Sequence, residues 1–343
     1  MGQTWPVTVI VVCHDSATEV PATLRALRAQ LEADDEVVVV DNASGDGTPD
    51  AVRASDPQAV VLEAGANLGF AAGCHVGVRA ASGRLLLFLN PDAEPAPGCV
   101  AALRAAAVEY PGWGAWQALV TLADGEHVNT AGNLVHWLGF GWAGGMGQRV
   151  AEVDHAPREV GFASGAAMMV RREAWEAAGG FDERYFMYGE DLDLSLRLRL
   201  AGWGIGVVPA ARVAHDYSFV KGDYKWFYLE RNRWWTLLGV YPRRLLAVTA
   251  PALVAFEAAL LVVAWRGGWL RAKLRAQLAV LRSLRAMLRR RRAVQATRVV
   301  SDRAFGEHLT ASLDSPYLSA AAGVPGLRAG QAAFWRAARA VLR

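Results

Sequence analysis

Residues 85–94 read Leu85-Leu86-Leu87-Phe88-Leu89-Asn90-Pro91-Asp92-Ala93-Glu94. The five consecutive apolar residues are typical of a strand that is buried on both faces, as in a parallel sheet. The run stops at Asn90-Pro91, because proline cannot donate to a strand ladder and biases the preceding residue toward an extended conformation. Taken alone, the stretch is explained by a strand that ends in an ordinary Asn-Pro-Asp turn.

Two carboxylates, Asp92 and Glu94, directly follow this strand. In open α/β sheets, ligands bind outside the carboxyl ends of the strands. A carboxylate pair at that position can hold a hard divalent cation that also binds phosphate oxygens. A metal site is therefore a second interpretation of the stretch, and the rest of the chain has to decide between the two.

Strand and helix patterns alternate before this stretch. Buried strands are expected at Val7–Cys13, at 36–40 and, more briefly, at 60–62. A helical period of apolar residues covers 20–31, and a small-residue helix ends near Ala81. This order predicts an α/β fold with a mostly parallel central sheet that helices cover on both sides. The first strand leads into Cys-His-Asp-Ser rather than Gly-x-Gly-x-x-Gly, which argues against an oxidoreductase.

The middle of the chain, residues 112–160, is rich in Gly and Trp. We predict a mobile loop at 139–147, and its aromatic residues either stack on a sugar or base or belong to the core. Residues 160–170 are predicted to form a strand, a turn and a second strand. The last strands of this part are expected at 204–208 and 212–215.

Between Leu192 and Leu200, leucines alternate strictly with polar residues, a period that is typical of a strand. We predict a helix instead, because Leu and Arg favour helices, no residue is β-branched, and Gly202 supplies a stop. Glu190 and Asp191 then lie in the first turn, where the helix dipole helps to keep carboxylates ionised. They are either functional or simply favourable first-turn acids.

Five short motifs together resemble those of the inverting family 2 glycosyltransferases, especially the bacterial branch that contains rhamnosyltransferases and cell-surface polysaccharide enzymes. In chain order they lie at residues 38–48, 67–73, 89–92, 180–183 and 189–193. Together they span roughly residues 5–220. The resemblance implies a Rossmann-like type A glycosyltransferase fold and a nucleotide-diphospho-sugar donor.

The resemblance also implies roles for donor-binding residues. Asp41 would hydrogen-bond the nucleobase, Asp92 would be the metal-binding aspartate of the Asp-x-Asp motif, and Asn90 occupies the first position of that motif. The implied donor-binding set also contains Asp15, Asn67 and Gly69. Two departures, His14-Asp15 in place of the common Tyr-Asn and His75 in place of a frequent Asn, leave the choice of nucleotide open.

The same resemblance implies the metal and the base. Glu94 and His215 are candidate ligands beside Asp92 for Mn²⁺ or Mg²⁺, although a lone histidine is by default structural. Asp191 would be the catalytic base, with Glu190 as its neighbour. Inversion by one in-line displacement needs one base to accept the proton of the acceptor hydroxyl, a role that is typically worth ~10²–10⁴-fold.

The C-terminal part of the chain is basic. From Arg243 to the end there are 18 Lys and Arg against 4 Asp and Glu, whereas the first 242 residues carry 18 against 29. Residues 245–265 are mostly apolar but contain Pro251 and Glu257, which favours helices at a membrane interface over a spanning helix. Residues 266–292 predict a basic helix that attracts anionic lipids. A solvated helix or a nucleic-acid surface are the alternatives, and we expect no nucleic acid because no known module is visible.

We therefore predict a nucleotide-sugar-binding catalytic domain at residues 1–222 and a helical, basic, membrane-associating extension at 223–343. The predicted enzyme moves a sugar, with rhamnose as a candidate, to a cell-surface glycan or a polyprenyl-diphosphate-linked acceptor. Three cysteines without metal-ligand spacing fit a cytoplasmic setting, at the inner face of the cell membrane. The alternatives are a non-catalytic carbohydrate-binding protein and a sugar nucleotidyltransferase.

Overall fold

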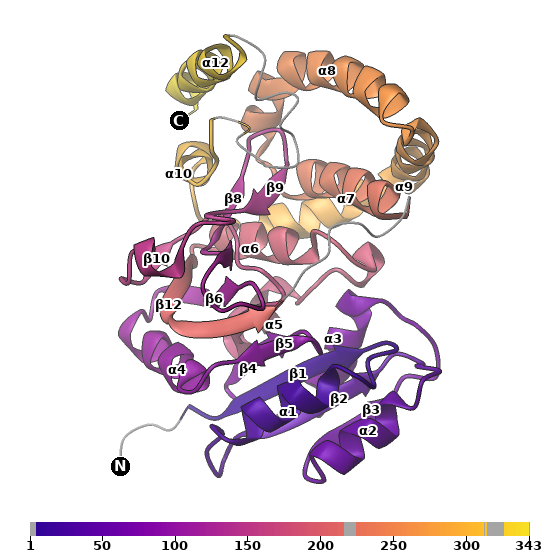
Figure 1. Cartoon of the computed structure of the whole chain (residues 1–343). Coiled ribbons are helices and arrows are strands. Elements are labelled where there is room, and N and C mark those ends of the chain that lie inside the picture. Colours follow the sequence, from indigo (N-terminus) through magenta and orange to yellow (C-terminus); the bar gives the residue numbers. More distant parts are fainter. Residues whose placement is uncertain (1–4, 216–223, 312, 314–325, 343) are drawn as a thin grey trace. The chain divides into compact units, whose positions relative to one another are not determined.

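The computed structural model describes residues 5–215, 224–311, 313 and 326–342 (Figure 1). The chain forms two compact units. Unit 1 holds Met1–Asn133, Ala143–Leu198 and Trp203–Ser218, and unit 2 holds Leu134–Trp142, Arg199–Gly202 and Phe219–Arg343. The predicted domain boundary after residue 222 falls in the segment 216–223, which lies outside the described residues.

Unit 1 is built on one mixed sheet with the strand order β10-β12-β6-β11-β4-β1-β2-β3. The short strands β5 and β7 pair with β12 and β6. The strands are β1 (Val7–Cys13), β2 (Glu36–Asp41), β3 (Val60–Glu63), β4 (Leu85–Leu89), β5 (Ala93–Pro95), β6 (Trp113–Thr121), β7 (Val128–Thr130), β10 (Arg158–Glu159), β11 (Ala167–Arg171) and β12 (Gly204–His215).

The four strands β4, β1, β2 and β3 pair in parallel, as predicted, so their carboxyl ends meet at one edge of the sheet. Strand β11 runs antiparallel to β4, with Ala167 opposite Leu89. The beginning of β11 therefore lies beside the end of β4. Every residue of β1 and β4 is buried, because both faces of the sheet are covered.

The two faces of the sheet bury alternate residues of each strand. On one face, Val9 and Leu87 pack with α1 (Val20–Arg28), α2 (Thr48–Ser55) and α4 (Cys99–Glu109). On the other face, Ile10 and Phe88 pack with α3 (Phe70–Ala80), α5 (Arg172–Ala178) and α6 (Glu190–Leu200). Two short 3₁₀ turns lie at η1 (Val150–Glu152) and η2 (Glu183–Tyr185).

Helix α6 confirms the helical prediction for the leucine-rich segment, and it begins at Glu190. All its residues from Leu192 to Leu200 are buried, the polar ones included. The alternation of leucine and polar residues therefore does not mark an exposed face. Arg197 shows how a polar residue is accommodated, because its guanidinium donates to Asp193 and to the carbonyl of Gly180.

The segment 139–147, predicted as a mobile loop, instead contains the strand β9 (Gly141–Ala143), which pairs with β8 (Asn133–Val135). Trp137 and Trp142 are buried, so these rings belong to the core rather than to a sugar-binding surface. Residues 160–170 form only one strand, β11, because 160–166 run as a loop past the end of β4.

Unit 2 consists mainly of helices, with α7 (Tyr224–Val240), α8 (Arg243–Arg266), α9 (Leu270–Ala296), α10 (Asp302–Glu307) and α12 (Leu327–Val341). By length and composition alone, α8 is apolar enough to cross a membrane, and only 17% of its most apolar window is buried. Its one acid, Glu257, is paired inside unit 2. It lies 2.8 Å from Nζ of Lys273 on α9 and also pairs with Arg233 on α7, which binds Glu230 at 3.1 Å.

Candidate active site

The polar residues predicted for the site lie at the edge of the sheet where the parallel strands end. Asp41 is the last residue of β2, Asn90 follows β4 directly, and the loop after β1 carries Asp15. In doubly wound sheets, the chain turns from each strand into a helix at this edge. Ligands bind in the crevice outside the carboxyl ends of the strands.

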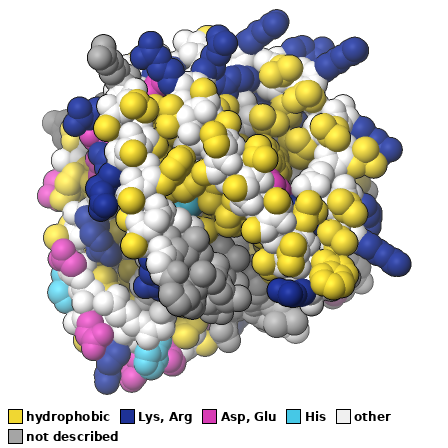
Figure 2. Space-filling model, turned by 90° about the horizontal axis from the view of Figure 1, so that it is seen from above, with side chains coloured by type: hydrophobic (Ala, Val, Ile, Leu, Met, Phe, Trp, Pro, Cys, Tyr) yellow, Lys and Arg dark blue, Asp and Glu magenta, His cyan; other side chains and the backbone are white. Residues whose placement is uncertain are grey.

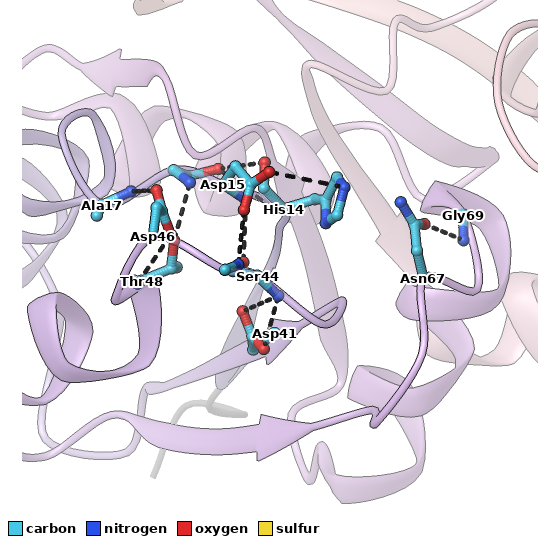
Figure 3. Close-up of polar contacts among 11 residues, drawn as sticks. His14, Asp15, Ala17, Asp41, Ser44, Asp46, Thr48, Asn67 and Gly69 are labelled. Carbon is cyan, nitrogen blue, oxygen red and sulfur yellow. Dashed lines mark hydrogen bonds and ion pairs between the residues drawn. The ribbon is translucent and has the colours of Figure 1, made fainter.

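The loops after β1 and β2 are joined by hydrogen bonds (Figure 3). The backbone N–H of Asp15 donates to Ser44 Oγ at 3.0 Å, and Gly45 N–H donates to Asp15 Oδ1 at 2.8 Å. Asp41 is buried, and its carboxylate accepts the N–H of Ser44 at 3.2 Å. Asp15 has a positive φ of 51° and is exposed. Two of the implied donor-binding residues thus belong to one pair of loops that are hydrogen-bonded to each other.

Asn67 and Gly69 shape the start of α3. Asn67 Oδ1 accepts the N–H of Gly69 at 3.0 Å (Figure 3), and the carbonyl of Gly69 accepts from Asn42 Nδ2 at 3.0 Å. Asn42 also accepts the N–H of Leu68 at 3.2 Å. Asn42 is buried and holds the turn against the end of β2. Its place next to Asp41 in the 38–48 motif was the only signal in the sequence for this role.

Asp92 and His215 come together at the other side of the site. The distance from His215 Nε2 to Asp92 Oδ1 is 3.2 Å, and Asn90 Nδ2 lies 3.3 Å from the same nitrogen. His215 is buried, whereas the Asp92 side chain is 43% exposed. The buried imidazole of His215 and the accessible carboxylate of Asp92 therefore lie directly beside each other.

Glu94 does not join this pair. In the β5–β12 ladder, Glu94 is opposite Ala214 and Ala93 is opposite His215. Since side chains alternate along a strand, Glu94 points to the face opposite that of His215, and it is exposed. Among the residues that the structure describes, no three His, Cys, Asp or Glu side chains are grouped as a metal site. Of the three ligands predicted from sequence, the structure brings Asp92 and His215 together, and their binding of a metal stays a prediction.

The remaining pair fits a divalent cation that a ligand helps to hold. Ligand atoms at right angles around an octahedral ion, with bonds of roughly 2.1 Å, lie about 3 Å apart. The separation of 3.2 Å between His215 Nε2 and Asp92 Oδ1 is close to that value. One imidazole and one carboxylate suit Mn²⁺ as well as Mg²⁺, and phosphate oxygens can complete the coordination.

Asp191 is held by two backbone N–H groups. Gly165 N–H donates to its Oδ2 at 3.0 Å, and Leu192 N–H donates to its Oδ1 at 2.7 Å. Burial raises the pKa of Asp191 above its usual value, and these two hydrogen bonds oppose the shift. The result is a half-buried carboxylate with a fixed orientation.

The loop 164–166 connects Asp191 to the Asp92–His215 pair. Gly165 binds Asp191, and the next residue, Ala166, accepts the N–H of Asn90 through its carbonyl at 3.0 Å. Asn90 in turn contacts His215. Sequence analysis did not identify Gly165 as a site residue. An added Cβ there would lie 3.4 Å from the Phe70 ring and 3.7 Å from Asp191 Cβ, so the position is closely packed.

Glu190 is buried beside Asp191. Burial first, and then the charge of Asp191, raise the pKa of Glu190 to about 8. Its Oε2 atom is buried without a hydrogen-bond partner among the described residues. The neighbouring charge of Glu190 also contributes to raising the pKa of the buried Cys74 thiol, after burial itself. Burial and the neighbouring carboxylate therefore favour the protonated form of Glu190.

Asp193 has a structural role. It is fully buried and accepts from the hydroxyl of Tyr185 at 2.8 Å and from Arg197 Nε at 2.8 Å. These bonds tie η2 to α6. His75, the second departure from the family pattern, donates through Nε2 to the carbonyl of Phe181 at 2.7 Å. Both residues thus support the backbone around the beginning of α6.

Two comparisons identify the family of the chain. The family model described as glycosyl transferase family 2 matches residues 8–178. The N-acetylglucosaminyl-diphospho-decaprenol L-rhamnosyltransferase of Mycobacterium tuberculosis (strain ATCC 25618 / H37Rv) is 32% identical over 237 residues, which cover 62% of this chain and 77% of that protein. The chain belongs to glycosyl transferase family 2. This family 2 glycosyltransferase is therefore an enzyme of the class that its motifs predicted.

A shorter similarity connects this glycosyltransferase with the rhamnosyltransferase WbbL of Escherichia coli (strain K12). The two are 40% identical over 75 residues, which cover 22% of this chain and 27% of WbbL. The similarity to rhamnosyltransferases was also predicted from the motifs, and it is confirmed.

Solved structures confirm the type A glycosyltransferase fold. GalNAc-T7, solved with UDP, GalNAc and Mn²⁺, matches with a TM-score of 0.59 and 15% identity over 74% of this chain and 52% of that chain. The mannosyltransferase PcManGT from Pyrobaculum calidifontis, solved with GDP-Man and Mn²⁺, matches with a TM-score of 0.51 and 20% identity over 85% of each chain. At these identities the likeness concerns the fold alone.

Proposed function

We propose that this glycosyltransferase is a metal-dependent, inverting enzyme that moves a sugar from a nucleotide-diphospho-sugar to a lipid-linked glycan acceptor. Rhamnose is the sugar that the relatives favour, since both are named as rhamnosyltransferases. The proposed residues are Asp191 as base, Asp92 and His215 as metal ligands, and Asp41 with its neighbouring loops for the nucleotide.

One observation carries the proposal. The loop 164–166 is bonded to Asp191 on one side and to Asn90 on the other, and Asn90 contacts His215 in the Asp92–His215 pair. The loop thus connects a candidate general base with a candidate cation site, and an in-line displacement uses one group of each kind. The nucleophile has to be deprotonated on one side of the reacting carbon while charge develops on the other.

Asp191 would accept the proton of the acceptor hydroxyl as that oxygen attacks the anomeric carbon. The bond from this carbon to the phosphate oxygen breaks, its electron pair leaves with the nucleoside diphosphate, and the configuration inverts. The raised pKa of Asp191 makes it a stronger base than an exposed aspartate. Its two backbone hydrogen bonds keep one oxygen lone pair oriented for the proton.

Asp92 and His215 would hold Mn²⁺ or Mg²⁺ together with the diphosphate of the donor. A bound divalent ion would stabilise the negative charge of the leaving nucleoside diphosphate as a Lewis acid. Asp15, Asn67, Gly69 and Asn90 complete the proposed donor site. Asn67 and Gly69 act through the shape of the turn before α3, which the hydrogen bond between them fixes.

We further propose that unit 2 associates with the inner face of the cell membrane. The exposed side of α9 combines leucines, such as Leu281 at 67% exposure, with arginines such as Arg282 and Arg285. Helix α8 exposes Val254 and Trp265. Figure 2 shows hydrophobic side chains gathered on one face, with Lys and Arg side chains around its margin. Such a surface suits an anionic membrane that carries a lipid-linked acceptor.

The test is a transfer assay with the full chain, a panel of nucleotide-sugars and a polyprenyl-diphosphate-linked acceptor, with Mn²⁺ present. We expect release of a nucleoside diphosphate and a product of inverted anomeric configuration, observed by NMR, and loss of both with a chelator. Retained configuration would contradict the mechanism, and activity in the chelator would contradict the metal site. Release of pyrophosphate would indicate a nucleotidyltransferase, and glycan binding without turnover would indicate a carbohydrate-binding protein.

A further inference from the structure

Unit 2 contains a pocket of about 730 Å³ between the beginning of α7, the end of α8 and the beginning of α9. Aromatic rings form much of its wall, namely those of Tyr224, Phe227, Tyr228, Trp265 and Trp269. The volume lies in the range that is typical of sites for small ligands, roughly 300–1,000 Å³. All of its lining residues belong to unit 2.

The charged side chains of the pocket are all positive. Arg271 and Arg275 line it from adjacent turns of α9, and no carboxylate is among its lining residues. Both arginines are exposed, and in the described part of the chain neither is paired with an acid. Arg275 lies 5.8 Å from the Phe227 ring centroid. Two available guanidinium groups against an aromatic wall favour an anionic group attached to an apolar one.

The basic side chains on the buried side of the same helices are bound to carboxylates and a carbonyl instead. Arg233, which is buried, donates to Glu230 and to the carbonyl of Leu138 at 3.0 Å. Lys273 is fully buried and bonds to Glu230 at 2.7 Å. These cations stabilise the packing of the helices and cannot reach a ligand. The charge available to a ligand is therefore concentrated at Arg271 and Arg275.

The N-terminus of α9 adds to this positive character. Gly268, Trp269 and Leu270 line the pocket, and the first helical hydrogen bond runs from Lys273 N–H to the Trp269 carbonyl at 3.1 Å. The first-turn N–H groups and the dipole of this 27-residue helix favour an anion there. Trp269 is held in place because its ring stacks on Trp226, with centroids 4.9 Å apart.

We propose that this pocket binds the diphosphate and the first isoprenoid units of the lipid-linked acceptor. The diphosphate would lie between Arg271, Arg275 and the N-terminus of α9, and the hydrocarbon would lie along the aromatic wall. The proposal rests on the proposed function, which supplies the acceptor class. A lipid is favoured over a nucleotide because apolar residues continue from the pocket within one helical turn, at Val262 and Leu274, which are 46% and 49% exposed.

The test measures binding of farnesyl diphosphate to the full chain in neutral detergent micelles by the quenching of tryptophan fluorescence. Arg271→Ala/Arg275→Ala is compared with Arg282→Ala/Arg285→Ala, which removes the same charge from the same helix outside the pocket. We expect at least about tenfold weaker binding for the pocket variant and less than a twofold change for the matched control. Arg271→Lys/Arg275→Lys, which keeps the charge, should bind with intermediate affinity.

Inorganic diphosphate and UDP are the competing probes. We expect both to bind the pocket at least about tenfold more weakly than farnesyl diphosphate, because neither can use the full aromatic wall. Three results would overturn the proposal: equal binding of inorganic diphosphate, UDP binding that is tighter and is lost in Arg271→Ala/Arg275→Ala, or equal losses in the pocket and control variants. Failure of the proposed function would show separately, as absence of nucleoside diphosphate release by the wild-type chain in the transfer assay.

Discussion

His215 Nε2 lies 3.2 Å from Asp92 Oδ1, although 122 residues separate the two along the chain. His215 ends β12, Asp92 follows β4, and the pairing of β5 with β12 brings them together. The contact joins two motifs that no local pattern links, and it is the part of the site on which the proposed metal binding rests.

His215→Ala should raise the Mn²⁺ concentration needed for half-maximal transfer by about tenfold or more, because one of two protein ligands is lost. Asp92→Ala should do the same and also weaken donor binding. Initial rates measured over a series of Mn²⁺ concentrations would check this. Glu94→Gln is the control, and its metal dependence should match that of the wild type because Glu94 lies on the other face of the ladder. A change with Glu94→Gln as large as that with His215→Ala would refute the two-ligand site.

Asp191→Asn should lower kcat by ~10²–10⁴-fold, the usual value of a general base. The amide cannot accept the proton, yet its oxygen can still accept the hydrogen bond of Gly165. The dissociation constant of the donor, measured by calorimetry with a non-hydrolysable analogue, should change little. Turnover near that of the wild type would remove Asp191 from the role of base.

Glu190→Gln should flatten the pH dependence of stability. The folded-state pKa is raised to about 8, above the unfolded value, so the stabilising contribution is complete below the unfolded pKa and is lost as pH rises through about 8. One such proton changes the free energy of unfolding by up to about 1.4 kcal/mol per pH unit between these values. Urea denaturation at pH 5, 7 and 9 measures the slope. An unchanged slope in the variant would show that another group binds the proton.

Gly69→Ala should destabilise the protein more than Gly98→Ala. Both glycines precede a helix with a positive φ, 82° and 83°. An alanine Cβ at 69 would lie 2.5 Å from the Phe186 ring, whereas at 98 it meets nothing within 4 Å. The second variant should cost about 1–2 kcal/mol from its left-handed backbone alone. The first should cost ~1–3 kcal/mol more, from overpacking and from a backbone with ψ of 169° that only glycine readily adopts. Equal denaturation midpoints for the two variants would contradict the close contact between Gly69 and Phe186.

Lys273→Met should cost about 3–5 kcal/mol of unfolding free energy, because Glu230 and Glu257 lose a buried partner. Adding Glu257→Gln should recover part of the loss, since one uncompensated charge is then removed. Thermal and denaturant unfolding of both variants provide the measurement. A double variant that is less stable than the single one would indicate that charge balance is not what stabilises this cluster.

The strands that hold the site could be predicted because their sequence signal is local. β1 and β4 are uninterrupted apolar runs, and the structure begins and ends them at the predicted residues. α6 could be predicted from helix propensity, although its burial on all sides could not. Arg197 is buried only because Asp193 and distant carbonyls meet it there.

The sequence could not predict how segments that are distant along the chain pair with each other. The face on which Glu94 lies depends on the register of β5 against β12, and that register is set by packing rather than by neighbours in sequence. Likewise, Gly165 became part of the site because β11 runs antiparallel beside β4 and brings its preceding loop to Asn90.

The ion pairs of Glu257 oppose the insertion of α8 across a membrane. A helix of this length and apolarity could be drawn across a bilayer, but the carboxylate would first have to leave Arg233 and Lys273, and Glu230 alone would then compensate both cations. Separating a buried ion cluster costs several kcal/mol, whereas lying in the interface costs none of it. The chain should therefore behave as an extractable protein, released from vesicles by alkaline carbonate, and replacing the cluster with apolar residues should convert it into one that resists extraction.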